Sequence, residues 1–470
     1  MIRGAFQILE RTFDSGRSPL PNTFHWLQQS APKFSINGDQ VSVLHQPEDF
    51  YRTILKECKN AKERIMLASL YVGTGALEKK LVETIGTRLK EEIGLKVNIL
   101  IDANRGSRGK VNSRQMLIPL LKKSDRQCQV SLFHTPLLRG PLKYILPQRY
   151  NELVGLQHMK LYLFDNSVLI TGANLSEDYF TNRQDRYIMI KDCKPLADFY
   201  WGLVKRISSV SFALDKFDTI TPRSFHPYKS DQQMYIREAR EKIWSYYKSS
   251  VQHTETDPNH DTWIYPLLEL PPLGVHQDSN MTKKLLESAE EGSVLTLSTG
   301  YFNLTEQYSD TIVNKSKGNF LIIMAHPTAN GFLKASGLAS GIPGAYTGLA
   351  LRFLNIVSNN DQNHRISMCE YRRPDWTYHA KGLWYTLRDE HLPSLTLIGS
   401  SNFGSRSVRR DIENQIAIVT ENQGLKARLK EEEESLKSFT TPFTIEVGLE
   451  PNRKPALWVL TTMILFKDFF

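Results

Sequence analysis

The chain has 470 residues, of which 40% are hydrophobic and 23% are charged, so it is long enough for two halves with substantial cores. This composition excludes wholesale disorder and a polytopic membrane protein, and because no run of about 18 apolar residues occurs, we expect no membrane-spanning helix. Lysine and arginine (59) exceed aspartate and glutamate (50), and the net charge of +9 favours anionic partners: nucleic acid, a phospholipid surface or phosphorylated substrates. The four cysteines form no C-x-x-C motif, which predicts buried free thiols rather than a zinc site or disulfides.

The predicted elements begin after an N-terminal segment, residues 1–30. Its first 21 residues mix arginines with apolar residues but also contain Glu10 and Asp14, which transit peptides normally avoid. We therefore expect at most the remnant of a targeting segment there.

Residues 31–215 alternate between helical and strand patterns, which predicts an α/β layered half. Apolar residues recur at helical spacing in 50–62. The elements expected after it are a strand at 64–71, a helix at 76–92, a strand at 96–102, a helix near 115–121, a strand at 130–133 and a strand containing His158.

Residues 263–470 repeat this order. A helix is expected at 282–290 and strands at 294–299, 320–325 and 366–370, before a strand containing His379. Residues 216–262 are expected to connect the halves, and their polar stretch 249–262 reads as a linker or a mobile loop. The acidic run at 431–434 reads as a solvated helix face.

The chemistry of the first half is concentrated in the pattern H-x-K-x4-D, formed by His158, Lys160 and Asp165. On a strand, His158, Lys160 and Tyr162 would share one face, and the apolar residues between them would point to the other. An imidazole beside an ammonium suits phosphoryl chemistry, because the histidine can attack phosphorus or move a proton while the lysine neutralises phosphate oxygens.

A second copy lies around His379 and Lys381. His158 precedes Asn174 by 16 positions and His379 precedes Asn402 by 23, so the second copy is 7 longer. An acid follows each asparagine by 11 positions: Asp185 follows Asn174, and Glu413 follows Asn402. One insertion near 388–391 explains both offsets, which favours duplication over two unrelated hairpins.

Paired H-x-K motifs, each followed by an asparagine and then an acid, resemble those of the phospholipase D superfamily. Further runs, such as Ala68–Gly75, Gly155–Arg186, Thr299–Leu304 and Ile416–Gln423, extend the resemblance over nearly the whole chain. The resemblance implies two pseudo-symmetric halves, each a mixed sheet flanked by helices, that share one central active-site cleft.

The resemblance also implies an activity. It points to the branch that transfers the phosphatidyl group of CDP-diacylglycerol to glycerol 3-phosphate, peripherally on the mitochondrial inner membrane. The implied partners are an anionic phospholipid surface and lipid and small-molecule substrates, without nucleic acid, and neither a cofactor nor a metal is required. The oligomeric state stays open.

The site residues follow from the same resemblance. One histidine would form a phosphohistidine intermediate and the other would protonate the leaving group, while both lysines and both asparagines stabilise the charge on phosphorus. Asp185 and Glu413 would hold the imidazole N–H groups, or else form surface salt bridges. We expect His158, in the complete motif, to be the nucleophile. Thr386 stands where the second motif would have Asp, and Asp389 or Glu390 is a possible substitute.

Two loops are candidates for binding phosphate. The first contains Ser69, Tyr71, Gly73, Thr74 and Gly75 between a strand and a helix, and it is either an anion cradle for the CDP pyrophosphate or a plain tight turn. The second carries three cations after the strand at 96–102, and it binds either a doubly charged phosphate or only solvent. These cations are Arg105, Arg108 and Lys110.

Three apolar segments are candidates for lipid contact, with packing into the core as the alternative for each. Two of them are 331–354 and the C-terminal 457–470. The third mixes large apolar side chains with cations before the His158 strand and consists of Leu137, Leu138, Arg139, Leu142, Lys143, Tyr144, Ile145 and Leu146.

Two rival functions remain at this stage. A phospholipase D-type phosphodiesterase or nuclease would use the same chemistry with water as acceptor, and basic-aromatic stripes would then favour nucleic acid. A non-catalytic membrane scaffold would follow if Thr386 marked a decayed second site, but the second motif keeps its other functional residues.

Overall fold

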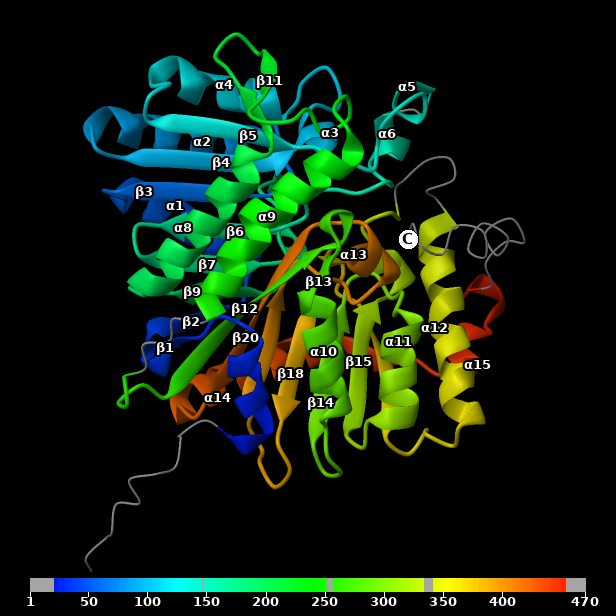
Figure 1. Ribbon diagram of the computed structural model, residues 1–470. Coiled ribbons are helices and arrows are strands. Elements are labelled where there is room, and N and C mark those ends of the chain that lie inside the picture. The colour runs from blue at the N-terminus through cyan, green and yellow to red at the C-terminus, as the bar shows by residue number, and fades with distance from the viewer. Residues whose placement is uncertain (1–20, 146–147, 252–256, 334–340, 454–470) are drawn as a thin grey trace, which may run out of the picture.

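Two mixed β-sheets dominate the computed structural model, which describes residues 21–145, 148–251, 257–333 and 341–453 (Figure 1). In spatial order, the first sheet consists of β11 (Ile220–Pro222), β10 (Phe212–Leu214), β5 (Cys128–Phe133), β4 (Lys96–Asp102), β3 (Arg64–Ala68), β6 (Leu161–Phe164), β7 (Ser167–Thr171), β9 (Tyr187–Ile190) and β2 (Val41–Leu44). Strands β3, β4 and β5 are parallel, and the remaining neighbours are antiparallel.

The second sheet repeats this arrangement. Its order is β1 (Phe34–Ile36), β12 (Thr262–Leu270), β20 (Glu413–Thr420), β19 (Leu395–Gly399), β18 (Gly382–Thr386), β14 (Val294–Thr299), β15 (Asn319–Ala325), β16 (Ile366–Tyr371) and β21 (Thr440–Pro442), with β13 (Val275–His276) beside β12. Strands β14, β15 and β16 are parallel as β3, β4 and β5 are, and β18 pairs antiparallel with β14 as β6 does with β3. The expected pair of pseudo-symmetric halves is confirmed.

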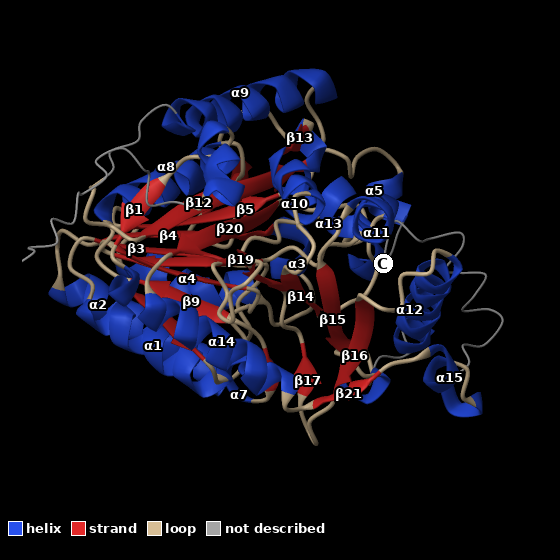
Figure 2. Cartoon of the chain, turned by 90° about the horizontal axis from the view of Figure 1, so that it is seen from below, coloured by secondary structure: helices blue, strands red, loops and turns tan. Residues whose placement is uncertain are grey.

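Helices cover the outer face of each sheet. The first sheet is covered by α1 (Pro47–Asn60), α2 (Ala76–Glu91), α4 (Ser113–Lys123) and α7 (Glu177–Thr181). The second is covered by η1 (Asn22–Gln29), α10 (Gln277–Glu287), α11 (Glu306–Asp310) and α12 (Ile342–Asn359). Short helices lie in the loops: α3 (Ala103–Gly106), α5 (Leu142–Ile145), α6 (Gln148–Asn151), α13 (Ser405–Arg409) and α15 (Ile445–Gly448). Figure 2 shows these layers from below.

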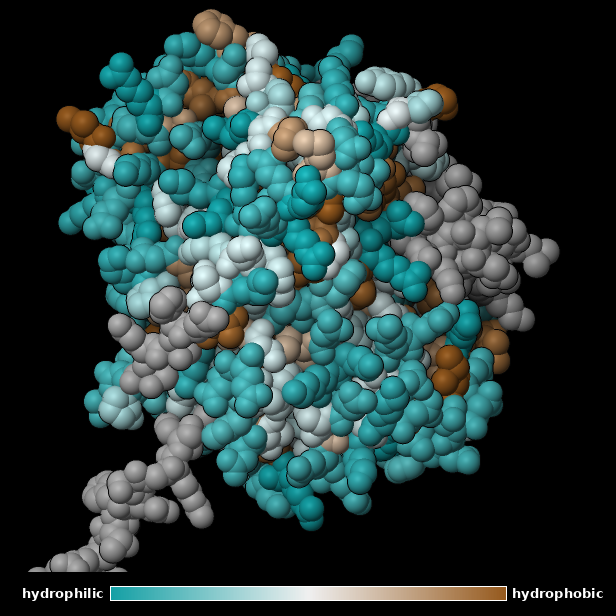
Figure 3. All heavy atoms as spheres, viewed as in Figure 1, coloured by the Kyte–Doolittle hydropathy of each residue, from teal (hydrophilic) through white to brown (hydrophobic). Residues whose placement is uncertain are grey.

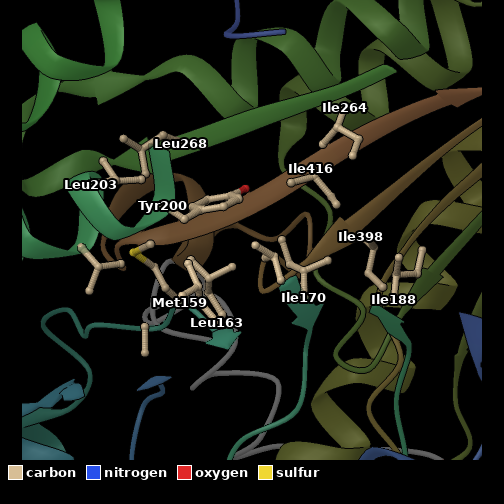
Figure 4. Close-up of a cluster of buried hydrophobic side chains, with 14 of the residues drawn as sticks. Met159, Leu163, Ile170, Ile188, Tyr200, Leu203, Ile264, Leu268, Ile398 and Ile416 are labelled. Atoms are coloured by element: carbon tan, nitrogen blue, oxygen red, sulfur yellow. The ribbon is translucent and has the colours of Figure 1, made fainter. Parts of the chain in front are cut away.

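One hydrophobic cluster joins the two halves. It fills the space between the sheets together with α8 (Lys194–Ser209), α9 (Gln232–Val251) and α14 (Gln423–Lys437). In Figure 4, Ile170 and Ile188 from the first half lie opposite Ile416 and Ile398 from the second. Removing this much apolar surface from water is the main force holding the halves together.

Most elements lie close to their predicted bounds, for a physical reason that β4 illustrates. Its residues Val97–Asp102 are all buried, and strands buried on both faces read as nearly continuous apolar runs, which are easy to recognise. In α1, Pro47 takes the first turn and Phe50, Ile54 and Cys58 recur every four residues on the buried face.

The two H-x-K segments differ from prediction. His158 and Lys160 lie in an extended segment immediately before β6, and His379 and Lys381 lie between β17 (Thr377–Tyr378) and β18. β17 pairs in parallel with β8 (Arg183–Gln184) of the other half. The residues leave the ladder because their backbone is tied to the opposite half rather than to a neighbouring strand.

Segments expected to lie before or between the halves are tied to the two sheets. In the N-terminal segment, residues 1–20 lie outside the described part, but η1 buries Phe24 and Leu27 in the second half. The expected connecting region contains β11 and α9, and β1 pairs with β12 of the second sheet. Of the expected linker, residues 252–256 lie outside the described part, while Asp261 accepts a hydrogen bond from the Gly38 backbone (2.8 Å).

The acidic run on α14 is only half solvated. Glu431 and Glu434 are exposed, but Glu432 and Glu433 are buried and paired, so the prediction of a solvated face is wrong for them. The four cysteines are free as expected. Cys58, Cys128 and Cys193 are buried, and Cys369 is half-buried.

Candidate active site

Each H-x-K segment is anchored to the other half of the molecule. The His158 backbone N–H donates to the Ile412 carbonyl (2.9 Å), and the His379 N–H donates to the Gln184 carbonyl (2.8 Å). Asp102, at the end of β4, accepts from the Gln157 N–H (3.0 Å) and its burial raises its pKa to about 8. These backbone contacts place both histidines at the junction between the halves.

Each histidine is paired with a carboxylate from the opposite half. His158 Nδ1 lies 2.9 Å from both oxygens of Glu413, and His379 Nδ1 lies 2.6 Å from Asp185. Burial lowers the pKa of both imidazoles, so both are neutral near pH 7. With Nδ1–H donated to Glu413, His158 Nε2 keeps its lone pair available for a proton or a phosphorus atom. At His379, Lys381 Nζ also lies 2.7 Å from Nδ1, and the Tyr179 hydroxyl lies 3.3 Å from Nε2.

The two lysines are fully buried between the histidines. Lys160 Nζ donates to the His158 carbonyl and Lys381 Nζ to the His379 carbonyl, both at 2.8 Å, and Lys381 Nζ lies 3.6 Å from Asp185. Burial lowers the pKa of Lys160 and brings that of Lys381 to about 8, while it raises the pKa of Asp185 to about 6. An unpaired charge is unfavourable in these low-dielectric surroundings. Coulomb attraction is also stronger there than in water, so the ammonium groups would strongly attract an incoming anion.

The two asparagines are linked through hydroxyl groups to a histidine or to its carboxylate. Asn174 Nδ2 donates to the Tyr179 hydroxyl (3.2 Å), which in turn lies 3.3 Å from His379 Nε2. In the second half, the Ser407 hydroxyl contacts the Asn402 N–H (3.2 Å) and donates to Glu413 (2.9 Å). Within the described residues, the buried Oδ1 atoms of both asparagines have no hydrogen-bond partner, as expected of groups that face a polar ligand.

Asp165 is not part of this site. It follows β6 at positive φ (49°) in the turn to β7, and its carboxylate accepts from the backbone N–H groups of Lys62, Glu63 and Arg64 at 2.8–3.1 Å. The prediction that Asp165 is a catalytic residue is therefore wrong: β6 carries it away from His158, and it fixes the start of β3.

Neither acid of the insertion reproduces these contacts. Thr386 ends β18, and Asp389 is exposed beside Arg388. Glu390 accepts from Ser394 and from Lys426 Nζ (3.1 Å), which belongs to α14. The position of the missing Asp in the second motif therefore corresponds to the turn that Asp165 occupies in the first half, and not to a place in the active site.

The first phosphate loop is only partly placed as expected. Ser69 is buried and donates to the Tyr71 carbonyl (2.9 Å), and Tyr71 lies under the Arg105 guanidinium (4.0 Å). Gly73 and Gly75, however, lie against the buried carboxylate of Glu78, and Thr74 is exposed. Because that carboxylate already faces the start of α2 and repels anions, the prediction of an anion cradle at Gly73–Gly75 is not supported.

The second phosphate loop is also largely committed to other partners. Arg108 Nη1 donates to both carboxylate oxygens of Glu152 (2.8 and 2.9 Å), and Lys110 is exposed to solvent. Arg105 remains stacked on Tyr71. Of the three predicted cations, Arg105 is thus the one held against an aromatic residue of the cleft.

The expected lipid-contact segment around α5 has two sides. Leu137, Tyr144 and Ile145 are exposed, at 38%, 73% and 74% respectively. Leu138 is buried, and Lys143 turns inward to contact His134 Nε2 (2.8 Å) and the face of Tyr228 (3.6 Å). The view in Figure 3 is mostly hydrophilic with small separate hydrophobic patches, one of them at α5.

The remaining members of that segment add little to it. Arg139 Nη2 donates to the Ser230 carbonyl (2.5 Å), so this cation is held inside the fold. The side chain of Leu142 and the whole of Leu146 lie outside the described residues. The prediction of membrane docking is therefore wrong for Leu138, which is buried, and for Lys143, which turns inward.

The other two candidate segments for lipid contact lie partly or wholly outside the described residues. In 331–354, residues 334–340 lie outside the described part, and α12 buries Tyr346, Ala350 and Phe353 against the second sheet. Residues 457–470 also lie outside it. In the part of the chain that is described, no helix combines the length and the apolar character needed to cross a membrane.

Several site residues escaped the sequence analysis. Arg183 stacks over Tyr179 (4.7 Å), and Arg406 Nε donates to Asp411 (2.8 Å) near His158. Tyr179 follows Asn174 by five positions, as Ser407 follows Asn402, so aligning the two halves past the asparagines would have revealed both hydroxyls.

A metal could be considered at His158, Asp411 and Glu413, whose ligand atoms lie within 4.8 Å of one another. The two carboxylates already accept hydrogen bonds: Asp411 accepts from Arg406 and the Leu156 N–H. Glu413 accepts from His158 and Ser407. Two nearby cations, Lys160 and Arg406, further disfavour a metal ion, so this donor set does not fit one.

Comparisons with known proteins agree with this geometry. A family model described as "Cardiolipin synthase, PLD-like domain" matches residues 54–202. The Homo sapiens protein named CDP-diacylglycerol–glycerol-3-phosphate 3-phosphatidyltransferase, mitochondrial, is 42% identical over 95% of this chain and 86% of its own length. The Saccharomyces cerevisiae protein named CDP-diacylglycerol–glycerol-3-phosphate 3-phosphatidyltransferase is 33% identical over 95% of this chain and 92% of its own.

A solved structure shares the fold. The crystal structure of phosphatidylserine synthase from Haemophilus influenzae superposes with a TM-score of 0.70, covering 95% of this chain and 99% of that one at 21% identity. The likenesses to the human, yeast and Haemophilus influenzae proteins cover 95% of this chain and so extend over both halves, whereas the family model matches the first half.

Proposed function

This chain belongs to the family of CDP-diacylglycerol–glycerol-3-phosphate 3-phosphatidyltransferases, with a phospholipase D-like fold, and we propose that it transfers the phosphatidyl group of CDP-diacylglycerol to glycerol 3-phosphate. The products are phosphatidylglycerophosphate and CMP. The observation that carries the proposal is the pair of neutral histidines, each oriented through Nδ1 by a buried carboxylate and each flanked by a buried lysine.

In the first step, His158 Nε2 attacks the phosphorus that bears the diacylglycerol. The N–P bond forms as the P–O bond to CMP breaks, and His379 donates a proton to the departing CMP oxygen. His379 is neutral in the free protein, and the negative charge of the substrate favours its protonation. Lys160 and Lys381 neutralise the charge that builds up on the phosphoryl oxygens.

In the second step, a hydroxyl of glycerol 3-phosphate attacks the same phosphorus. His379 takes the hydroxyl proton, the new P–O bond forms, and the N–P bond breaks so that its electron pair returns to His158 Nε2. Glu413 and Asp185 keep both rings in one tautomer through the cycle. Because the cations and the acid–base groups are all supplied by side chains, no cofactor is required.

The exposed side chains of α5 supply the proposed contact with the lipid surface. Tyr144 and Ile145 are apolar enough to enter the interfacial region of a bilayer, and the net charge of +9 favours an anionic one. The location in the name of the human relative, the mitochondrion, is the location we propose for this chain, with peripheral attachment to the inner membrane.

The test is a transfer assay with labelled CDP-diacylglycerol in mixed micelles, with and without glycerol 3-phosphate. We expect wild-type protein to release CMP and phosphatidylglycerophosphate only with the acceptor, and His158→Ala to do neither. Release of phosphatidic acid without the acceptor would indicate a hydrolase instead, and no turnover by folded wild-type protein would leave a scaffold.

A further inference from the structure

An arginine that belongs to neither H-x-K motif lies beside His379. The Arg183 guanidinium stacks over the Tyr179 ring (4.7 Å), and the hydroxyl of the same ring lies 3.3 Å from His379 Nε2. The Tyr179 side chain therefore spans the distance between the Arg183 guanidinium and His379 Nε2, the proposed proton acceptor. The charge of Arg183 also acts on His379, lowering its pKa after the larger effects of burial and Lys381.

The guanidinium is held in place but only weakly neutralised. Its Nε donates to the Thr377 hydroxyl (3.0 Å), which fixes the side chain at the β8–β17 junction. Its Nη2 lies 3.1 Å from Asp178, whose side chain is 62% exposed while that of Arg183 is only 14% exposed. An ion pair to a solvated carboxylate contributes little, so a phosphate can replace Asp178 at small cost.

A second polar group converges on the same place. A Cβ on Gly331 would lie 2.9 Å from the Tyr301 hydroxyl and 3.5 Å from Arg183 Nη2, so the backbone at Gly331 runs directly past both groups. The Tyr301 ring packs edge-on against the His379 ring, with 5.5 Å between centroids. Arg183 and the Tyr301 hydroxyl thus both lie close to Gly331, on the His379 side of the cleft.

Two further arginines, Arg406 and Arg108, are more firmly occupied, and Arg105 lies on Tyr71 (4.0 Å), whose hydroxyl contacts Ser176 and not His379. Arg406 Nε donates to the buried Asp411 (2.8 Å) and its Nη2 donates to the Glu152 carbonyl (2.8 Å). Arg108 is paired with Glu152, whose side chain is 13% exposed. A buried acid is a costly partner to displace, so these guanidinium groups are poorer candidates for a transient anion.

We propose that Arg183, with the Tyr301 hydroxyl, binds the phosphate of the acceptor. This assignment rests on the proposed function, in which His379 accepts the proton of the attacking hydroxyl. The acceptor hydroxyl must then lie at His379 Nε2, and the rest of the acceptor must extend from that point. A glycerol phosphate carries its dianion at the other end of a short carbon chain, and the Arg183 guanidinium, held on the Tyr179 ring beside His379 and paired with the solvated Asp178, is placed to bind it. Lys160 and Lys381 remain free to serve the reacting phosphorus.

The experiment measures KM for each substrate separately in Arg183→Gln. Loss of a charge-assisted contact to a phosphate predicts a rise in KM for glycerol 3-phosphate of roughly 10- to 100-fold. KM for CDP-diacylglycerol should change by less than about twofold. Arg183→Lys keeps the charge but loses the planar guanidinium, so its KM for glycerol 3-phosphate should lie between those of the wild type and Arg183→Gln. This variant tests the assignment if Arg183→Gln does not fold.

Arg206→Gln provides the matched control. Arg206 is likewise half-buried and stacked on a tyrosine (Tyr246, 3.7 Å), but it lies on α8, away from the site. It should leave both KM values unchanged. An unchanged KM for glycerol 3-phosphate in Arg183→Gln, or an equal rise in both KM values, would overturn the assignment. Absence of acceptor-dependent product from the wild type would instead reject the proposed function, whatever Arg183 does.

Discussion

Two buried carboxylates orient the two histidines, and this gives a sharp prediction for single residues. Asp185→Asn keeps the size of the side chain but presents an amide to His379 Nδ1, which destabilises the productive tautomer and the imidazolium. We expect kcat to fall by about 10³-fold, with little change in either KM.

Asp165→Asn is the control for that variant, because both remove one carboxylate charge from the first half. Asp165 accepts from three backbone N–H groups in a turn, so its loss should reduce the free energy of unfolding by about 1–3 kcal/mol and leave kcat of the folded protein near wild type. A loss of kcat in Asp165→Asn as large as in Asp185→Asn would show that the turn acts on the site.

The coupled pair of Asp185 and Lys381 predicts the pH dependence of activity. Burial raises the pKa of Asp185 to about 6 and lowers that of Lys381 to about 8. The acid must be ionised and the lysine protonated, so kcat/KM should fall below about pH 6 and above about pH 8, with apparent values that belong to the pair. A pH–rate profile that stays flat down to about pH 4, the ordinary value for a carboxyl group, would contradict this.

At the scale of elements, α5 is the segment through which the surface is expected to reach lipid. Tyr144→Ser together with Ile145→Ser removes its exposed apolar side chains without touching the inward Lys143. We expect binding to vesicles containing anionic lipid to weaken by about tenfold or more, as measured by co-sedimentation.

The control for this variant is Ile93→Ser, which changes an even more exposed isoleucine (88%) in the loop after α2. Vesicle binding should be unaffected by that change. Equal weakening in both variants would mean that exposed apolar residues act without regard to position, and α5 would lose its assigned role.

The sequence predicts correctly those elements whose pattern of apolar and polar residues is set within the element itself. The strand at 294–299 is confirmed at both ends because its apolar residues lie between polar turns. The His158 segment was misjudged because an isolated strand and an extended segment anchored to Ile412 have the same alternating pattern. No local pattern reveals that the partner of His158 is Glu413, which lies 255 positions away.

The same limit applies to the phosphate loops and to the acidic run. Gly73–Gly75 has the residues of an anion cradle, but the side chain that fills it, Glu78, belongs to the following helix. In the sequence, Glu432 is one of four consecutive acids with nothing to distinguish it. In the structure it pairs with Arg186 of the other half. In both cases tertiary structure supplied the partner that decides the role.

At the scale of the whole molecule, Arg186 links the two halves. It comes from the first half, yet its fully buried guanidinium pairs with Glu432 (2.7 Å), donates to the Leu397 carbonyl (2.8 Å) and lies over the Trp384 ring (3.7 Å). Glu432→Ala would leave this charge buried without its carboxylate. We expect a loss of about 3–5 kcal/mol in the free energy of unfolding, measured with chemical denaturant.

Glu434→Ala is the matched control, because it removes an exposed acid two positions further along the same helix. Its partner Lys430 is partly exposed, so the loss should be below about 1 kcal/mol. The Glu432→Ala transition should remain single, since the shared core unfolds with both halves. Two separate transitions in that variant would show that the halves are independent folding units.

The crossed pairing of histidines and acids has a consequence for the newly made chain. During translation the complete first motif leaves the ribosome long before Glu413 is synthesised, and until then His158 has no carboxylate to set its tautomer. A product of premature termination, or a chain cut by a protease anywhere before Glu413, would carry an intact H-x-K sequence and still be chemically silent.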